Sequence, residues 1–455
     1  MRMPYAFGVA AIALQMGGCG LIQKSEPRVP AIERLPAPSV STLSPPPPSR
    51  PAPTSASRRD LPSAVSKTSG RIDNVPVKGM AAIAPTKSGT NASPMRSAQI
   101  DGRALAMGLL PGHVTDSAGW ATDLAAVFDA LCLPATVENL CAAVAVIGQE
   151  SGFQADPMVP CLSRLAWGEI EKRREKLGIP RAVLDTALAL RSPDGRTYKT
   201  RLDAVRTERE LSRVFEDFVA MVPLGDRLLG RYNPVRTGGP MQVSVAFAEE
   251  FARGRPYPFS REGNLRSEVF ARRGGLYFGV AHLLNYLAPY ERPIYRFADF
   301  NAGRFASRNA AFQNAVSALS GHRLVPDRDL LRYDGDEPAQ DASETQKAVL
   351  ALSARLELNQ AETLRALRLE KAEGFERTTL YRRVFALSDR VSGARLPRAA
   401  LPEIKLNGPK IQRNYLTTAW FAKRVETRYR NCLSQGAGTL ATERSYSRMS
   451  TLASR

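Results

Sequence analysis

The sequence has no apolar run of the roughly 20 residues that a membrane-spanning helix needs, so its body is not predicted to be transmembrane. Histidine is scarce: the three histidines stand singly, and no two cysteines have the two-residue spacing of a zinc site. Signatures of a Ser/His/Asp triad and of a phosphate-binding loop are absent as well. The sequence therefore predicts no metal and no cofactor.

The first residues have the layout of a secretion signal. A basic residue, Arg2, precedes an apolar run from Tyr5 to Leu14, and the small residues Gly17 and Gly18 follow. We therefore predict that residues 1–18 are a signal peptide and that the rest of the chain is exported.

Residues 16–19, Met-Gly-Gly-Cys, resemble the lipobox of bacterial lipoproteins, which usually has leucine where Met16 stands. The resemblance implies cleavage before Cys19, a lipid on that cysteine, and a membrane as partner. Because Gly20 rather than aspartate follows, the resemblance also implies the outer membrane, with the body facing either the periplasm or the exterior. The alternative is an ordinary signal peptide in which Cys19 is incidental.

Four further cysteines are Cys132, Cys141, Cys161 and Cys432. An even number in an exported chain indicates two disulfides, and four cysteines allow three pairings. We favour Cys141 with Cys432 and Cys132 with Cys161, which would pin the chain end to the central helix. Buried free thiols are the alternative.

The formal net charge of +19 would indicate nucleic-acid binding in a cytosolic protein. Export removes nucleic acid as a partner. The anions of the envelope are lipid phosphates, lipopolysaccharide and the carboxylates of peptidoglycan stem peptides, and a basic surface concentrates the protein near them. A plain solvated basic surface is the alternative.

Composition divides the chain into a tether and a folded body. Residues 19–99 are rich in Pro, Ser and Ala, and we predict a disordered tether whose span is roughly 50 Å. The body is predicted to contain a helical domain at 100–325 with an insertion at 158–232, a C-terminal helical region at 326–433 and a flexible tail at 434–455. Helices are predicted from Thr136 to Ile147 and at 162–191, 202–221, 243–253, 273–287, 309–319, 342–356, 360–371, 380–390 and 417–432.

The helix that Thr136 caps is apolar on every side, which predicts that it is buried. Near its end stands Glu150. Emergence from an apolar helix and the negative end of the helix dipole both raise the pKa of a carboxyl, as a general acid at neutral pH requires. Glu150 is therefore the candidate catalytic residue. The alternative is a solvent-facing glutamate with an ordinary pKa.

Three later segments accompany Glu150: 237–243 (Thr-Gly-Gly-Pro-Met-Gln-Val), 273–284 (Arg-Gly-Gly-Leu-Tyr-Phe-Gly-Val-Ala-His-Leu-Leu) and 295–303 (Tyr-Arg-Phe-Ala-Asp-Phe-Asn-Ala-Gly). The glycines of the first segment permit a tight turn with an amide side chain poised to bind a polar ligand. Taken in order, the segments resemble the lysozyme-like lytic transglycosylases. That family has Glu-Ser at the end of its core helix, a Gly-Leu-Met-Gln turn, a helix with Gly and Tyr-Leu, and Tyr-Asn-Ala-Gly.

The resemblance implies a mainly α, lysozyme-like core with inserted and C-terminal helices, and cleavage of the β-1,4 bond after N-acetylmuramic acid in peptidoglycan. Glu150 would protonate the leaving oxygen and later accept a proton from the sugar's own 6-hydroxyl, so a single carboxylate suffices. Ser151 would orient Glu150. The substrate-binding site would consist of Ser151, Met241, Gln242, Tyr277 and Asn301.

Two departures from the family pattern bear on this interpretation. Pro240 replaces the family's leucine and Phe300 its tyrosine, so a hydroxyl near the acid is missing, and Tyr277 or Tyr295 is the candidate substitute. The interval from Glu150 to the glycine turn is also several times the usual one. The basic helices predicted at 162–221 fill it and would form a lid, extend the cleft or cover it.

A second resemblance covers most of the body, from 121 to 433. Segments such as 233–242 (Asn-Pro-Val-Arg-Thr-Gly-Gly-Pro-Met-Gln) and 295–303 are similar to the YaiW-type outer-membrane lipoproteins, a family without an established activity. This resemblance supports the lipid anchor and leaves the chemistry open. Three hypotheses follow: a lytic transglycosylase, a non-catalytic lipoprotein that binds peptidoglycan fragments or peptides and assists their uptake, or a purely structural tether.

Overall fold

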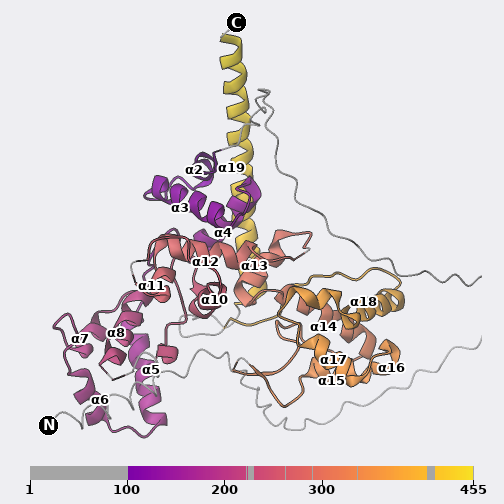
Figure 1. Ribbon diagram of the computed structural model, residues 1–455, viewed down its shortest axis with the longest axis horizontal. Helices are drawn as coiled ribbons and strands as arrows, with labels where there is room; N and C mark the ends of the chain where they lie inside the picture. The colour runs from indigo at the N-terminus through magenta and orange to yellow at the C-terminus, as the bar shows by residue number, and fades with distance from the viewer. Residues whose placement is uncertain are drawn as a thin grey trace, which may run out of the picture. The chain divides into compact units, whose positions relative to one another are not determined.

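The computed structural model describes residues 101–221, 223, 230–261, 263–288, 290–335, 337–406 and 416–453, and from residue 437 onward the backbone alone. The predicted signal peptide 1–18, lipidation site Cys19 and tether 19–99 lie outside the described residues. The described part is mainly helical, as predicted (Figure 1). It also contains two short antiparallel hairpins. None of its helices combines the length and the apolar character that crossing a membrane requires.

Three clusters of buried apolar side chains organise the described residues. The largest, which we call the first core, combines segments from both ends of the body. Its elements are α2 (Gly102–Leu109), α3 (Ser117–Ala130), α4 (Val137–Glu150), β1 (Thr237–Gly238), β2 (Val243–Ser244), α10 (Val245–Phe251), α11 (Leu265–Val269), α12 (Arg272–Leu284), α13 (Pro293–Ala302) and α19 (Thr418–Ala453).

Helix α4 is the predicted central helix of the first core. The Thr136 side chain caps it by accepting a hydrogen bond of 3.2 Å from the Asn139 N–H, and Glu138 lies in the first turn. Every residue from Leu140 to Ile147 is buried, as the absence of a polar face predicts. The prediction of a capped helix that is buried from Leu140 to Ile147 is confirmed.

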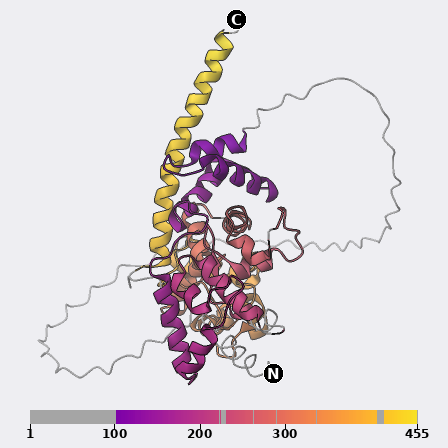
Figure 2. The same cartoon turned by 90° about the vertical axis from the view of Figure 1, so that its left-hand side faces the viewer.

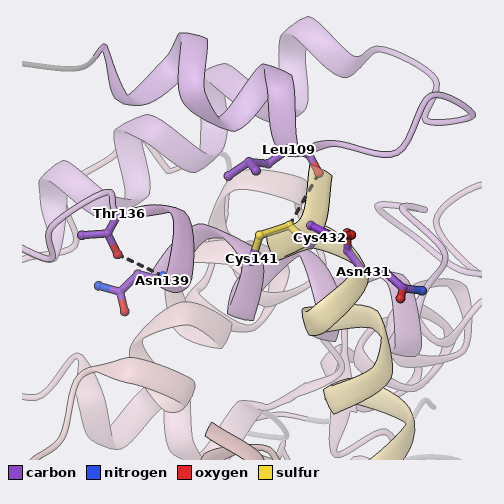
Figure 3. The surroundings of a disulfide bond; sticks show 7 residues. Leu109, Thr136, Asn139, Cys141, Asn431 and Cys432 are labelled. Carbon is purple, nitrogen blue, oxygen red and sulfur yellow. Dashed lines mark hydrogen bonds between the residues drawn. A yellow bond between two sulfur atoms is a disulfide. The ribbon is translucent and has the colours of Figure 1, made fainter. Parts of the chain in front are cut away.

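Helix α19 lies along α4 and α13 (Figures 1 and 2). A disulfide joins Cys141 of α4 to Cys432 of α19 with 5.5 Å between the Cα atoms, beside Leu109 (Figure 3). One turn further, Gly436 faces Val137, because a methyl group at Gly436 would lie 2.8 Å from Val137 Cγ1. Contacts therefore move to lower residue numbers in α4 as residue numbers increase in α19, so the two helices are antiparallel. The predicted pairing of Cys141 with Cys432 is confirmed.

The same helix continues into the predicted flexible tail, 434–455. The sequence predicts fraying after Ser434, whereas α19 continues to Ala453. Packing of Gly436 against α2 and α4 carries the helix past Ser434.

The other predicted disulfide is wrong: Cys132 and Cys161 are free and exposed. Cys132 follows α3 next to Leu131, which belongs to the first core. Cys161 precedes Leu162, which belongs to a different core. The fold thus places the two thiols at the edges of separate packing units.

The insertion has a hydrophobic core of its own, which we call the insertion core. Its elements are α5 (Leu162–Lys176), α6 (Arg181–Leu188), α7 (Tyr198–Ala204) and α8 (Glu208–Ala220), followed by the 3-10 turn η1 (Gly230–Tyr232). Each of the two long helices predicted here is broken. Gly178 has a left-handed φ of 65° and Pro180 caps α6, while Thr207 and Glu210 form a capping box at the start of α8.

The C-terminal core is the third cluster. Its elements are α14 (Ala306–Ser320), β3 (Tyr333–Asp334), β4 (Glu337–Pro338), α15 (Glu344–Ala351), α16 (Ser353–Leu356), α17 (Gln360–Leu367), η2 (Glu373–Arg377) and α18 (Thr379–Ser392). The sequence placed α14 with the first domain and α19 with the C-terminal region. Side-chain packing places them the other way round, because buried residues of α14 contact α18 and those of α19 contact α4.

Candidate functional site

The candidate acid, Glu150, is the last residue of α4 and is half-buried. Ser151 follows it as a buried C-cap. The Ser151 hydroxyl donates a 3.1 Å hydrogen bond to the Ile147 carbonyl oxygen, and its N–H donates to the same atom at 3.0 Å. The hydroxyl hydrogen of Ser151 is therefore used to close the helix end, so it is not available to orient Glu150.

The chain leaves α4 through two left-handed residues, Gly152 (φ 59°) and Phe153 (φ 65°). A left-handed non-glycine residue is strained, and such strain concentrates at functional sites and persists where packing enforces it. Packing enforces it here, because the buried Phe153 ring meets Trp120 edge-on at 5.6 Å and His113 at 6.5 Å. The turn that follows Glu150 is thereby locked against α3.

Charge pairs hold α3 to α12 beside this turn. The Arg272 guanidinium lies 5.4 Å from the Trp120 ring centre and pairs with Asp116 and Asp123 at 2.6 Å each. Arg273 pairs with the other Asp123 oxygen at 2.7 Å. The buried Asp123 carboxylate is thus neutralised by two arginines, and α12 is fixed relative to the end of α4.

The glycine turn is a hairpin between β1 and β2 that packs on α12. A methyl group at Gly239, whose φ is 73°, would lie 2.1 Å from the Val269 carbonyl oxygen, and one at Gly279 would lie 2.4 Å from Met241 Sδ. These glycines permit close approach between the turn and its neighbouring helices, in addition to the tight turn that the sequence predicts. Met241 is fully buried in the first core and does not line a surface.

Gln242 is half-buried and has a left-handed φ of 50°. Its Nε2 donates a 3.2 Å hydrogen bond to the Gly239 carbonyl oxygen, so part of its amide stabilises the turn. Like Phe153, it is a strained residue directly beside a predicted motif.

Tyr277 and Asn301 also have partners within the protein. Tyr277 is buried among Phe251, Tyr257 and Phe259, with ring centres 5.6 to 5.9 Å apart, and burial raises the pKa of Tyr277. Asn301 lies near the end of α13, where its Oδ1 accepts a 2.8 Å hydrogen bond from the Thr418 hydroxyl. Asn301 therefore anchors the start of α19.

Two buried acids were not singled out from the sequence. Asp299 has no exposed surface and accepts hydrogen bonds from the Tyr290 hydroxyl at 2.7 Å and the Ser307 N–H at 2.7 Å, with Tyr286 and Phe305 as further donors. Burial raises its pKa. Asp299 lies inside the segment 295–303, and its donors show that it organises the start of α14.

Glu268 is the second such acid, and its Oε2 accepts a 3.0 Å hydrogen bond from the Tyr257 hydroxyl. It belongs to α11, a short helix that the apolar periodicity does not predict. In the part of the chain that the structure describes, no group of three or more His, Cys, Asp or Glu residues is arranged to hold a metal ion.

Fold and site together define a mainly helical, disulfide-linked protein in which an acid ends a buried helix and the glycine turn packs on α12 in the same core. The chain belongs to the family described as "Protein of unknown function (DUF1615)", which matches residues 113–435. It is 53% identical to the uncharacterized protein YaiW of Escherichia coli (strain K12) over 326 residues, which cover 72% of this chain and 88% of that protein. No solved structure matches the chain.

Proposed function

We propose that this protein is a lipid-anchored lipoprotein of the outer membrane that acts on peptidoglycan as a lytic transglycosylase, with Glu150 as general acid and base. The observation that carries the proposal is the position of Glu150: a half-buried carboxylate at the end of a helix that is buried along its whole middle. Strained residues beside it and in the glycine turn, Phe153 and Gln242, add support because strain concentrates at functional sites.

The reaction requires Glu150 to donate one proton and later to accept one. Glu150 gives its proton to the oxygen that leaves as the glycosidic bond breaks. The 6-hydroxyl of the muramic acid residue then attacks the anomeric carbon and returns its proton to Glu150, which closes the anhydro ring and restores the acid. No water enters the product, so one carboxylate serves both steps.

Export and anchoring rest on separate observations. The lipobox-like residues 16–19 lie directly before the tether. The disulfide between Cys141 and Cys432 fits an oxidising compartment such as the periplasm or cell surface. Incorporation of a fatty-acid analogue tests the anchor, because label should be lost in Cys19→Ala. Label retained in that variant would remove the lipid from the proposal.

Cleavage is tested with the full-length protein in detergent and insoluble peptidoglycan. Soluble anhydromuropeptides, identified by mass spectrometry, should appear with the wild type and vanish with Glu150→Gln. Glu138→Gln is the matched control, since it makes the same change at the exposed other end of α4 and should leave cleavage intact. Products that persist in Glu150→Gln would contradict the proposal.

The second candidate is a non-catalytic protein that binds peptidoglycan fragments or peptides. It is favoured over catalysis by the Ser151 hydroxyl, which donates to the Ile147 carbonyl oxygen and therefore not to Glu150, the acid it was predicted to orient. A folded wild type that binds peptidoglycan without releasing products would select this candidate.

A further inference from the structure

Two arginines on α19, Arg424 and Arg428, stand one turn apart without an acidic partner among the described residues. Arg424 is exposed, and its guanidinium lies 5.2 Å from the Trp420 ring centre. Arg428 is half-buried, and its Nε is buried without a hydrogen-bond acceptor. Like charges one helical turn apart repel each other, so the fold keeps an unneutralised pair here at a cost.

The third arginine of this stretch of α19, Arg430, does have an acidic partner. Glu426 pairs with Arg430 at 2.9 Å and with Arg292 of the loop before α13 at 3.2 Å. One face of the helix therefore neutralises its cations, whereas the face with Arg424 and Arg428 does not. This contrast within a single helix points to an anion that the chain itself does not supply.

The arginine pair lies at the end of α4 that carries the candidate acid. A methyl group at Gly148 would lie 3.8 Å from Arg428 Cδ and 4.0 Å from its Nε, so the Arg428 side chain crosses the α4 backbone at Gly148. The two helices are antiparallel, and Arg424 therefore lies further along α4, level with its C-terminus. The disulfide at Cys432, one turn past Arg428, fixes this register.

The substrate of the proposed function narrows the chemistry of the anion. The stem peptide of peptidoglycan carries carboxylates, and a carboxylate is a planar acceptor that can take two hydrogen bonds from one guanidinium group. The phosphate of an anionic lipid is the competing anion, because it offers acceptors to the same groups.

We propose that Arg424 and Arg428 form a carboxylate-binding site for the stem peptide of peptidoglycan. This site rests on the proposed function, and it would hold the peptide part of the substrate beside the catalytic end of α4. The lactyl-linked peptide of the sugar would engage α19 while the glycan meets Glu150.

The test is calorimetric titration of full-length protein in detergent with three probes: a tetrapeptide released from peptidoglycan, the disaccharide without peptide, and vesicles containing anionic phospholipid. Arg424→Gln and Arg428→Gln should each weaken tetrapeptide binding by roughly tenfold, because each removes a charge-assisted hydrogen bond. Disaccharide binding should not change. Arg430→Gln, on the same helix but paired with Glu426, is the matched control and should bind as the wild type does.

Arg428→Lys separates geometry from charge, since it keeps the cation and loses the planar fork, and we expect an intermediate affinity. Equal tetrapeptide affinity in all variants, or no tetrapeptide binding by the wild type, would overturn the site. If the variants lost binding to the vesicles alone, the site would bind lipid phosphate and the stem-peptide proposal would be overturned. A lower melting temperature of Arg428→Gln with unchanged affinity would show that the arginine only stabilises the α4 dipole.

Failure of the site and failure of the proposed function are distinguishable. Tetrapeptide binding without peptidoglycan cleavage would refute the enzyme and leave the site standing. Cleavage by a wild type that binds no tetrapeptide would refute the site alone.

Discussion

The first core and the C-terminal core secure their distant segments by different means. In the first core a buried disulfide joins α4 to α19 across 291 residues of sequence. In the C-terminal core the corresponding connections are polar: Arg308 and Glu370 are almost entirely buried, and each bonds to backbone groups of a distant segment. Arg308 donates to the carbonyl oxygens of Glu370 and Ala372, and the Glu370 carboxylate accepts from the N–H groups of Leu330 and Leu331.

The two cores should therefore be destabilised by different changes. A disulfide stabilises by restricting the unfolded chain, and its contribution does not depend on protonation in the neutral range. A buried ionisable network stabilises only while every donor and acceptor is matched, so a lost partner or a change of charge is costly.

Removal of the disulfide should be the most damaging change. The double variant Cys141→Ala and Cys432→Ala should lower the free energy of unfolding by about 3–5 kcal/mol, because the bond closes a loop of nearly 300 residues. Hydrogen exchange read by mass spectrometry should rise in α4 and α19 and stay unchanged in α14 and α18. Equal loss of protection in both cores would show that they unfold as one unit and would remove the contrast.

Arg308→Ala should damage the C-terminal core. The guanidinium also packs 4.2 Å from the Phe305 ring centre and 5.1 Å from that of Phe375, so its loss leaves a cavity and unsatisfied carbonyl groups. We expect a loss of about 3 kcal/mol in the free energy of unfolding, measured by denaturant titration. Arg377 is an exposed arginine of η2, so Arg377→Ala is the control and should lower the free energy of unfolding only slightly.

Glu370 of the C-terminal core and His282 of the first core should respond to pH in opposite directions. Burial raises the pKa of Glu370 to about 7 from its ordinary 4.5, so its contribution is fully present below pH 4.5 and is lost as pH rises through 7. In the first core, burial lowers the pKa of His282 to about 3, and its Nδ1 is buried without a partner. The His282 contribution is therefore present above pH 6.5 and is lost as pH falls towards 3.

Hydrogen exchange measured at pH 5 and pH 7.5 checks this contrast, after correction for the intrinsic exchange rate. Protection of the C-terminal core should fall at the higher pH, and Glu370→Gln should abolish that change. A pH response of the C-terminal core that survives in Glu370→Gln would assign it to another group.

The smallest effect is expected from the surface ion pairs of α19. The Arg430 side chain is 66% exposed, and exposed pairs contribute at most about 1 kcal/mol. Arg430→Gln should therefore have a melting temperature only slightly different from that of the wild type. A large shift would mean that ion pairs, rather than the disulfide and apolar packing, hold α19 in place.

Much of the secondary structure followed from local rules. Thr136 caps α4, the run after it is apolar all round, and the structure confirms a buried helix. The breaks in the insertion at Pro180 and Thr207 were missed, although proline and a capping box mark helix starts, because the apolar period continues across them. The short helix α11 offers too few residues for any period to appear.

The candidate site, like the secondary structure, could be predicted only in part. Sequence alone selected Glu150, the glycine turn and the pairing of Cys141 with Cys432. It could not show which helices the glycines allow the turn to approach, because a glycine has the same conformational freedom whichever segment it meets.

Local patterns were enough to predict the capped helix α4, its buried middle and the acid that ends it, because caps and apolar periods act over a few residues. They could not predict that α19 packs on α4, that α14 belongs to the C-terminal core, or that Arg424 and Arg428 share one unneutralised face. These outcomes depend on which surfaces meet, and the side-chain packing that selects them joins residues hundreds of positions apart.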